Sequence, residues 1–378
     1  MTEQIYTNYR LQLPDQEVIG TLVVRDGKIA DIQPGIVNQG QNGQETYLMP
    51  GLIELHTDNL EKCMSPRPGV RWPIEAAATY HDRDLISAGV TTVCDAIGIG
   101  DVKPVSNRKS HFKAMIEMII EGQKAGRFAA DHRLHLRCEL SYEKVVDVAH
   151  HYSEHPLLSL ISIMDHTPGQ RQFVNIEKYI EYYVGKYGLS TQEMADFIKM
   201  RQEIQEKYAE KNRQALVQLT QNKNIALATH DDATVEHIQE AVENGAVISE
   251  FTTTLDAAKM AKESGLKVLM GSPNLVLGGS HSGNVSALEL AQKDWVDLLS
   301  SDYVPHSLLQ SIFILANRLK KPLYQVMRLV TSNPAKAINL FHDRGSLEVG
   351  KRADLIIVYN DGIVPRITSV VCGGQRVA

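Results

Sequence analysis

The sequence predicts an α/β protein, a (β/α)8 TIM barrel with a small β-sandwich that is built from both chain ends. Three features predict it: hairpin strands near the N-terminus, a long middle in which short apolar segments alternate with helical stretches, and strands without helices near the C-terminus. We expect residues 1–50 and 343–378 to form one composite β-sandwich domain and residues 51–342 to form the catalytic barrel.

The two chain ends show strand patterns. Residues 18–34 (VIGTLVVRDGKIADIQP) read as two alternating strands joined at Asp26-Gly27, a dipeptide typical of tight hairpin turns. Near the C-terminus, residues 346–360 and 369–377 give further strands separated by turn residues. Each end alone has too few strands to be stable, so we expect the ends to fold together.

The middle of the chain contains eight apolar segments of strand length, the number that a closed barrel requires. Residues 191–211 are charged and helical in composition, and we interpret them as an insertion or extended helices after the fourth strand. The expected strands are residues 52–58, 90–97, 134–140, 157–166, 225–232, 246–252, 266–272 and 296–302.

The composition is that of a globular protein. The 378 residues are 43% hydrophobic and 22% charged, enough for a large core, and no run approaches the roughly 20 apolar residues of a membrane span. Four widely spaced cysteines without a CxxC pair argue against disulfides and a thiolate zinc site. The net charge of -6 and scattered basic residues argue against nucleic-acid binding. No export signal is visible at the N-terminus, so we expect a cytoplasmic protein.

Six polar residues stand at the carboxyl ends of the predicted strands, where the active sites of such barrels lie. Their types suit a divalent metal. If they had only a structural role, each buried polar side chain would need its own hydrogen-bond partner to offset the free energy lost on desolvation. We therefore expect one or two divalent ions; zinc is the first expectation, and manganese or iron would suit the same ligands. The predicted ligands are His56, Asp58, Glu139, His166, His230 and Asp302.

Two of these positions also predict chemistry. His56 and Asp58 are two residues apart on one strand, so both side chains face the same way and can hold one ion. Asp302 follows the last apolar strand. Because a metal lowers the pKa of bound water, a carboxylate beside it can accept the proton of the attacking water, and we predict Asp302 as the catalytic base.

Loops after the strands carry candidate groups for an anionic substrate. Gly278–Asn284 (GGSHSGN) follows the seventh strand, a common place for phosphate binding in barrels. Arginines follow the first and fourth strands and offer paired donors for phosphoryl oxygens. The predicted substrate-binding residues are Arg67, Arg71, Arg171, Ser280, His281, Ser282 and Asn284.

Two longer patterns carry a resemblance to known proteins. PGLIELHTD resembles the opening motif of the amidohydrolase superfamily, with Asp58 in place of a second histidine. SNPAKAINL and RGSLEVGKRADLIIV resemble the superfamily's closing motif, where the chain leaves the barrel and completes the small sheet domain. The superfamily contains metal-dependent hydrolases, which agrees with the ligands predicted above.

A more specific resemblance extends over almost the whole chain. The motifs LIELHTDNLEK, PRPGVRWP, HRLHLRCEL, MDHTPGQRQF, ATHDDAT, GGSHSGN and SSDYVP are similar to the PhnM family of the carbon-phosphorus lyase pathway. This resemblance implies a diphosphatase of phosphonate metabolism. Its substrate would be α-D-ribose 1-methylphosphonate 5-triphosphate, and its products the 5-phosphate and diphosphate.

The sequence departs from the superfamily pattern at three places. No lysine stands at a strand end to serve as a carboxylated bridge, and Glu139 is the available bridging carboxylate. Histidines are usual on strands five and six, but here His166 ends strand four and His230 ends strand five. Either the strand count is displaced by one or His166 is a ligand peculiar to this family. Glu250 ends strand six, and a metal or substrate contact and a capped strand end explain it equally well.

Three function classes follow from these patterns: hydrolysis of a phosphoric anhydride, hydrolysis of a C–N bond in a cyclic amide or N-acyl compound, and a non-catalytic role in a phosphonate-processing complex. The His-x-Asp pair, Glu139 and the arginine-bearing loops favour the first class. Metal identity and number, the phosphorus attacked, homo-oligomer formation and association with other proteins are left open by the sequence.

Overall fold

The structure, a computed structural model, describes residues 3–67, 69–100, 111–171, 180, 190–280 and 283–378. The chain divides into two compact units. The first comprises Met1–Asp95, Met118–Arg133 and Met270–Ala378, and the second comprises Ala96–Glu117 and Leu134–Leu269.

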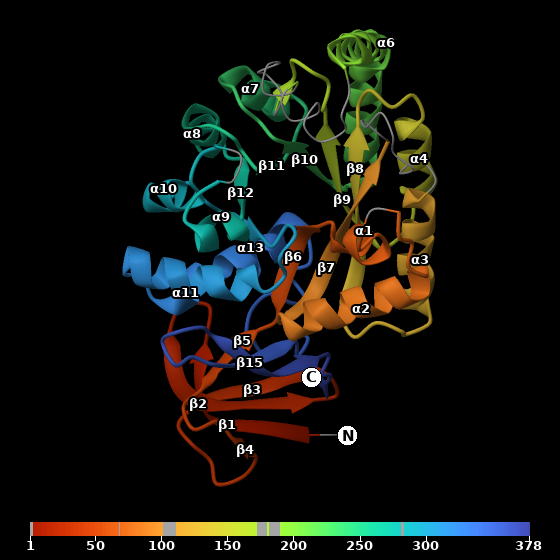
Figure 1. The fold of residues 1–378 in the computed structure, drawn as a ribbon. Helices are drawn as coiled ribbons and strands as arrows, with labels where there is room; N and C mark the ends of the chain where they lie inside the picture. Colours follow the sequence, from red (N-terminus) through yellow and green to blue (C-terminus); the bar gives the residue numbers. More distant parts are fainter. Residues whose placement is uncertain (1–2, 68, 101–110, 172–179, 181–189, 281–282) are drawn as a thin grey trace. The chain divides into compact units, whose positions relative to one another are not determined.

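One sheet of the first unit is built from both ends of the chain, and the two termini lie beside it (Figure 1). Its strand order is β16-β15-β14-β5-β1-β2-β3, with β4 paired to β1. The C-terminal strand β14 is antiparallel to β5, which joins it to the N-terminal strands. The strands are β1 (Glu3–Gln12), β2 (Glu17–Arg25), β3 (Lys28–Pro34), β4 (Gln41–Asn42), β5 (Tyr47–Pro50), β14 (Leu355–Tyr359), β15 (Arg366–Cys372) and β16 (Gln375–Arg376).

The predicted hairpin is confirmed as β2 and β3. Its turn residues Asp26 and Gly27 have φ angles of 51° and 78°, the left-handed conformation that a two-residue hairpin turn requires. The first strand, β1, was not among the predicted segments. Its pairing with β2 shifts register between Tyr6 and Tyr9, where Asn8 has a φ of 60°, so the alternating pattern is broken within the strand.

A single apolar core fills this sheet region and draws on both chain ends. Burial of these side chains stabilises the pairing of the two ends, because neither end could cover its apolar face alone. The domain boundaries at residues 50 and 343 stay a prediction. The core residues are Tyr6, Tyr9, Leu11, Leu22, Val24, Ile29, Leu48, Leu347, Ala353, Leu355, Ile357 and Val371.

The eight predicted strands of the middle are all present and form a parallel sheet in chain order, β13-β12-β11-β10-β9-β8-β7-β6. A parallel bridge between Thr57 and Asp302 links the two end strands, so the sheet is a nearly closed barrel. The predicted fold class is therefore confirmed. The strands are β6 (Leu52–Thr57), β7 (Val90–Ile99), β8 (Asp131–Glu139), β9 (Leu158–Met164), β10 (Ala226–His230), β11 (Ile248–Glu250), β12 (Lys267–Gly271) and β13 (Leu298–Ser300).

Helices alternate with these strands, and local capping fixes several of them. The predicted helical stretch after strand four is the 33-residue α6, which starts at a capping box of Ser190 and Glu193. Thr234 and Thr254 cap α7 and α8 directly after β10 and β11. The helices are α1 (Asn59–Met64), α2 (Ile74–Ser87), α3 (Phe112–Lys124), α4 (Val145–Tyr152), α6 (Thr191–Lys223), α7 (Val235–Glu243), α8 (Leu255–Glu263), α9 (Ser272–Leu277), α10 (Ala287–Gln292), α11 (Ser307–Leu319), α12 (Leu323–Val326), the 3-10 helix η3 (Met327–Val330) and α13 (Ser332–Ala337).

None of the helices in the described ranges has the length and apolar character that crossing a bilayer requires.

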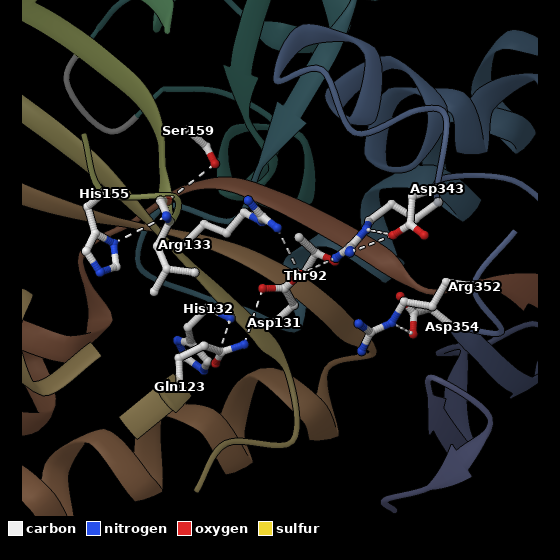
Figure 2. A network of polar contacts seen from close by, with 12 residues as sticks. Thr92, Gln123, Asp131, His132, Arg133, His155, Ser159, Asp343, Arg352 and Asp354 are labelled. Carbon is white, nitrogen blue, oxygen red and sulfur yellow. Dashed lines mark hydrogen bonds and ion pairs between the residues drawn. The ribbon is translucent and has the colours of Figure 1, made fainter. Parts of the chain in front are cut away.

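A buried charge network in the first unit ties the segment before β14 to the beginnings of β7 and β8 (Figure 2). The Arg344 guanidinium donates to Asp131 at 2.5 Å, to Thr92 at 2.8 Å and to Asp343 at 2.8 Å. Burial alone would raise the pKa of Asp131, but the charges of the neighbouring arginines outweigh it and lower that pKa. The three hydrogen bonds of Arg344 therefore position the chain where it leaves the barrel.

Candidate functional site

In the first unit, His56 lies on β6, and Asp58, predicted on the same strand, follows its end as the residue before α1. A buried carboxylate, Glu54, fixes this strand: it accepts hydrogen bonds from the His56 amide at 2.7 Å and from the Ser301 amide at 2.6 Å. The Ser300 hydroxyl lies 2.6 Å from the same carboxylate. Burial raises the pKa of Glu54 although these hydrogen bonds oppose the shift. The contacts join β6 to β13 directly below the strand ends.

Asp302 lies beside the same strand end. The Thr57 hydroxyl donates to the Asp302 carbonyl at 2.8 Å, and Asn59 donates to the Thr57 hydroxyl at 2.8 Å. Asp302 has a φ of 53°, an uncommon conformation for a residue other than glycine. The structure thus brings the backbone of Asp302 next to the strand that bears His56. Local backbone strain of this kind is frequent at functional sites.

In the second unit, Glu139 at the end of β8 is paired with His166, which follows β9. The carboxylate lies 2.9 Å from His166 Nδ1 and also accepts from the Ser141 hydroxyl at 3.0 Å. Arg201 of α6 lies 3.4 Å from it. Burial would raise the pKa of Glu139, but the His166 hydrogen bond and the Arg201 charge hold it below its ordinary value. Glu139 is therefore ionised and orients the His166 ring with Nε2 pointing away from it.

The ends of β10 and β11 repeat this arrangement. His230 Nδ1 lies 3.3 Å from the Glu250 carboxylate, so Glu250 orients the His230 ring as Glu139 orients that of His166. The next residue after each strand, Asp231 and Phe251, has a φ of 57° and 54° respectively. The Phe251 ring packs edge-on against His230 at a centroid distance of 5.4 Å. The chain thus turns at both strand ends through a residue other than glycine in the left-handed conformation.

The two oriented histidines converge on one carboxylate. Asp231 Oδ2 lies 3.5 Å from His230 Nε2 and 3.8 Å from His166 Nε2, and we call these three residues the strand-end cluster. The separations are too long for good hydrogen bonds. They match the distance of about 3.4 Å between two ligands placed tetrahedrally around an ion at about 2.1 Å from each. The donor set therefore fits a divalent metal.

The electrostatics of Asp231 agree with this fit. Burial raises the pKa of Asp231, and the positive charges of His166, Arg137 and Arg171 only partly oppose the rise. A buried carboxylate of this kind is stabilised in its ionised form when a cation lies against it. Asp231 was not among the predicted ligands, although it stands directly after His230 in the quoted motif ATHDDAT.

The predicted substrate residue Arg171 is buried and paired. Its two terminal nitrogens contact Asp232 and Glu240, and the residue is only 4% exposed. The two carboxylates compensate its charge, so these contacts favour a positioning role over direct capture of an anion. Its predicted contact with substrate stays a prediction.

The other predicted substrate residues lie in the first unit. Arg67 and Arg71 are exposed in the loop between α1 and α2, and Ser280 and Asn284 are partly buried after α9. Gly278 and Gly283 in this loop have φ angles of 81° and 76°, which suit close approach of a ligand to the backbone. His281 and Ser282 lie outside the described residues.

Two further residues were not anticipated from the sequence. Arg201 lies on α6, and the charged composition of that helix predicts only a solvent-exposed surface. Arg137 lies on β8, two residues before Glu139. Alternation along β8 puts Arg137 on the same face as Glu139, and this is the signal that could have found it.

Comparison with known proteins identifies the family and the fold of the chain. Residues 191–377 match the Amidohydrolase family. N-acetylglucosamine-6-phosphate deacetylase from Pasteurella multocida shares the fold with a TM-score of 0.64 at 15% identity over 100% of both chains. A 5-methylcytosine deaminase from Klebsiella pneumoniae has a TM-score of 0.65 at 15% identity, over 99% of this chain and 97% of that one. The family match places the chain in the amidohydrolase class, whose members bind divalent metals, and the shared fold agrees with it.

A curated relative narrows the class to one family. The chain is 44% identical to alpha-D-ribose 1-methylphosphonate 5-triphosphate diphosphatase of Escherichia coli (strain K12), over 99% of this chain and 100% of that protein. The chain therefore belongs to the family of that diphosphatase, the PhnM family, and the resemblance drawn from its motifs is confirmed.

Proposed function

We propose that the chain is a metal-dependent diphosphatase that cleaves α-D-ribose 1-methylphosphonate 5-triphosphate to the 5-phosphate and diphosphate in phosphonate catabolism. The observation that carries this proposal is the 44% identity to the Escherichia coli enzyme over the whole of that protein. The oriented strand-end donors support a hydrolytic site. A cytoplasmic location is part of the same proposal.

The metal ligands that we propose come from the carboxyl ends of the barrel strands. The sequence predicts His56, Asp58, Glu139, His166, His230 and Asp302, and the convergence of the strand-end cluster adds Asp231. Glu139 and Glu250 contact the Nδ1 atoms of the two histidines, which leaves each Nε2 as the donor. The set suits zinc, and manganese or iron would fit the same donors.

A divalent metal bound by these residues would lower the pKa of a coordinated water and stabilise charge on phosphoryl oxygens. The residues of the chain supply the remaining steps. Asp302 accepts the proton of the attacking water. Arg67, Arg71 and the donors of the GGSHSGN loop hold the outer phosphoryl groups. Their positive charge and hydrogen bonds stabilise diphosphate as it leaves.

With the outer phosphoryl groups held by these loop residues, we propose attack on the phosphorus nearest ribose. The water oxygen bonds to that phosphorus, and the bond from it to the outer diphosphate breaks. Hydrolysis in heavy-oxygen water tests this direction: we expect the heavy oxygen in the ribose 5-phosphate product. Heavy oxygen in diphosphate would mean that the middle phosphorus is attacked.

The activity is tested by incubating the metal-loaded protein with the ribosyl triphosphate and, separately, with ATP and an N-acyl sugar. We expect diphosphate release from the ribosyl substrate at the highest rate. Release of acetate alone would favour C–N hydrolysis, and no turnover of any substrate would contradict the proposal.

Asp302→Asn should lower the turnover rate by about a hundredfold or more, because the base is lost while the side chain keeps its size. Asp361→Asn is the matched control, since Asp361 is a carboxylate in an exposed loop. A near-native rate for Asp302→Asn would remove Asp302 from the mechanism.

A further inference from the structure

Arg137 is a partly buried cation in the second unit, and its charge acts on the Asp231 carboxylate without forming an ion pair with it. It lies on β8 two residues before Glu139, and its Nη2 donates to His230 Nε2 at 3.3 Å. No ion pair joins it to a carboxylate among the residues that the structure describes. Its buried Nε has no hydrogen-bond partner within the described chain. The guanidinium thus makes one bond to a neutral acceptor and leaves a buried donor unused.

An Nε without a hydrogen-bond partner among the described residues also occurs at Arg213 of the same unit, so the lack of an ion pair is what sets Arg137 apart. Arg171 pairs with Asp232 and Glu240, and Arg201 pairs with Glu139. Arg213 pairs with Glu210 and Glu240. A partly buried cation without such a partner is poorly compensated, and an unsatisfied buried donor such as its Nε is destabilising. The position of Arg137 is therefore one that an anion from outside the chain would stabilise.

The chemistry of the group restricts that anion. A guanidinium only donates hydrogen bonds, and its planar fork matches two oxygens of a phosphoryl or carboxyl group. The His230 Nε2 lone pair that accepts from Arg137 is the one proposed to bind a metal. Metal binding at His230 therefore requires the Arg137 bond to break, which frees Nη2 beside the unused Nε.

We propose that Arg137 binds a phosphoryl oxygen of the substrate next to the strand-end cluster and stabilises the charge that develops there during attack. This inference rests on the proposed triphosphate hydrolysis and assigns a further substrate-binding residue to it. The proposal accounts for both the missing carboxylate and the unused Nε donor.

Binding of imidodiphosphate, an analogue whose bridging nitrogen resists hydrolysis, tests the proposal with the metal-loaded enzyme and without metal. We expect Arg137→Gln to weaken binding by about tenfold to a hundredfold in both states, as for a lost charge-assisted hydrogen bond. Arg137→Lys should have an affinity between those of Arg137→Gln and the unmodified protein, because lysine keeps the positive charge but lacks the paired donors of the guanidinium. Arg366→Gln is the matched control, because that arginine is exposed on the terminal sheet and paired with Asp361, and the variant should bind imidodiphosphate as the unmodified protein does.

A second measurement does not depend on a variant. The Arg137 Nε–H resonance of the unmodified protein should shift when imidodiphosphate is added, as the unused donor gains an acceptor. An unmoved resonance, or full affinity in Arg137→Gln, would overturn the proposal. Turnover of the ribosyl triphosphate is measured in parallel on the unmodified protein, so a failure of the proposed function is seen separately from a failure of Arg137 to bind phosphoryl groups.

Discussion

Among the described residues, each compact unit holds a cluster of two histidines and one aspartate. The strand-end cluster of His166, His230 and Asp231 belongs to the second unit. The other, which we call the buried cluster, consists of His81 on α2, Asp95 on β7 and His132 on β8 in the first unit. Composition alone would rate both as metal sites.

The distances separate them. In the buried cluster, Asp95 lies 2.6 Å from His81 Nε2 and 2.8 Å from His132 Nδ1. These are hydrogen-bond lengths, shorter than the separation of two ligands on one ion. All three side chains are at most 1% exposed, whereas the His166 side chain is 15% exposed. Hydrogen bonds therefore join the side chains of the buried cluster. The strand-end cluster has the spacing and the solvent access that a metal ion needs.

Charge supports the same division. His132 Nε2 also lies 3.3 Å from Asp82, so two carboxylates face one imidazole. Burial opposes protonation of His132, but the charges of Asp95 and Asp82 outweigh it and raise its pKa to about 9. A protonated histidine cannot bind a metal through either nitrogen. The comparison teaches that spacing and protonation, rather than residue types, assign a His–Asp cluster its role.

The largest expected effect is on metal content. His230→Ala should reduce bound metal to the level of chelator-treated protein. It should also lower activity by more than the roughly hundredfold loss that is typical when a residue hydrogen-bonded to a metal ligand is removed. His81→Gln should keep full metal content, since its amide can still donate to Asp95. Elemental analysis of both variants measures this. Full metal in His230→Ala, or loss of metal in His81→Gln, would reverse the roles of the two clusters.

Removing the central carboxylate of the buried cluster should be costly for stability. Burial opposes the ionisation of Asp95, but His132 and His81 outweigh it and lower its pKa to about 2. Asp95→Asn leaves the charged His132 poorly compensated, and we expect a loss of about 3–5 kcal/mol in the free energy of unfolding. Denaturant unfolding measures the loss, with Asp361→Asn as control. A variant as stable as the unmodified protein would show that the cluster contributes no net stability.

The pH dependence of stability should follow His132. Its pKa rises from 6.5 to about 9 on folding, so the stabilisation is fully present below pH 6.5 and is lost as the pH rises through 9. The rise corresponds to about 3 kcal/mol. His132→Gln should be less stable at pH 6 and should lack the His132 contribution to the decline from pH 6.5 to 9. Unfolding curves at several pH values test this, and an unchanged slope in the variant would contradict it.

The sequence predicted the strand-end histidines because each follows an apolar strand and must lie at the same edge of the barrel. It could not show that Asp231 completes their cluster. That role depends on a left-handed turn after β10, which aims a residue beyond the strand end. The predicted bridging role of Glu139 stays a prediction. The sequence also could not show that Glu139 contacts His166 Nδ1, because no sequence pattern encodes the orientation of the imidazole ring.

The buried cluster and the ion pairs of the arginines could not be predicted from sequence patterns for another reason. His132 lies next to Asp131 on β8, but alternation turns the two side chains to opposite faces, toward different partners. Arg171 follows a strand like the other predicted substrate residues, yet Asp232 and Glu240 compensate its charge. Such pairings join residues far apart in the chain, so only the fold reveals them.

The smallest expected effect distinguishes the two roles that the sequence left open for Glu250. Its carboxylate lies 3.3 Å from His230 Nδ1, the position of an outer partner that sets the ring and strengthens Nε2 as a donor. Glu250→Gln keeps the size and one acceptor but loses the charge. Metal affinity should then fall by about tenfold to a hundredfold, as is typical for such partners. Competition with a chelator of known affinity measures the change. Glu240→Gln is not a suitable control, because Glu240 pairs with Arg171. Glu289→Gln, at a partly exposed position of α10, serves instead. Complete loss of metal in Glu250→Gln would instead make Glu250 a direct ligand, whereas unchanged affinity would leave it a capped strand end.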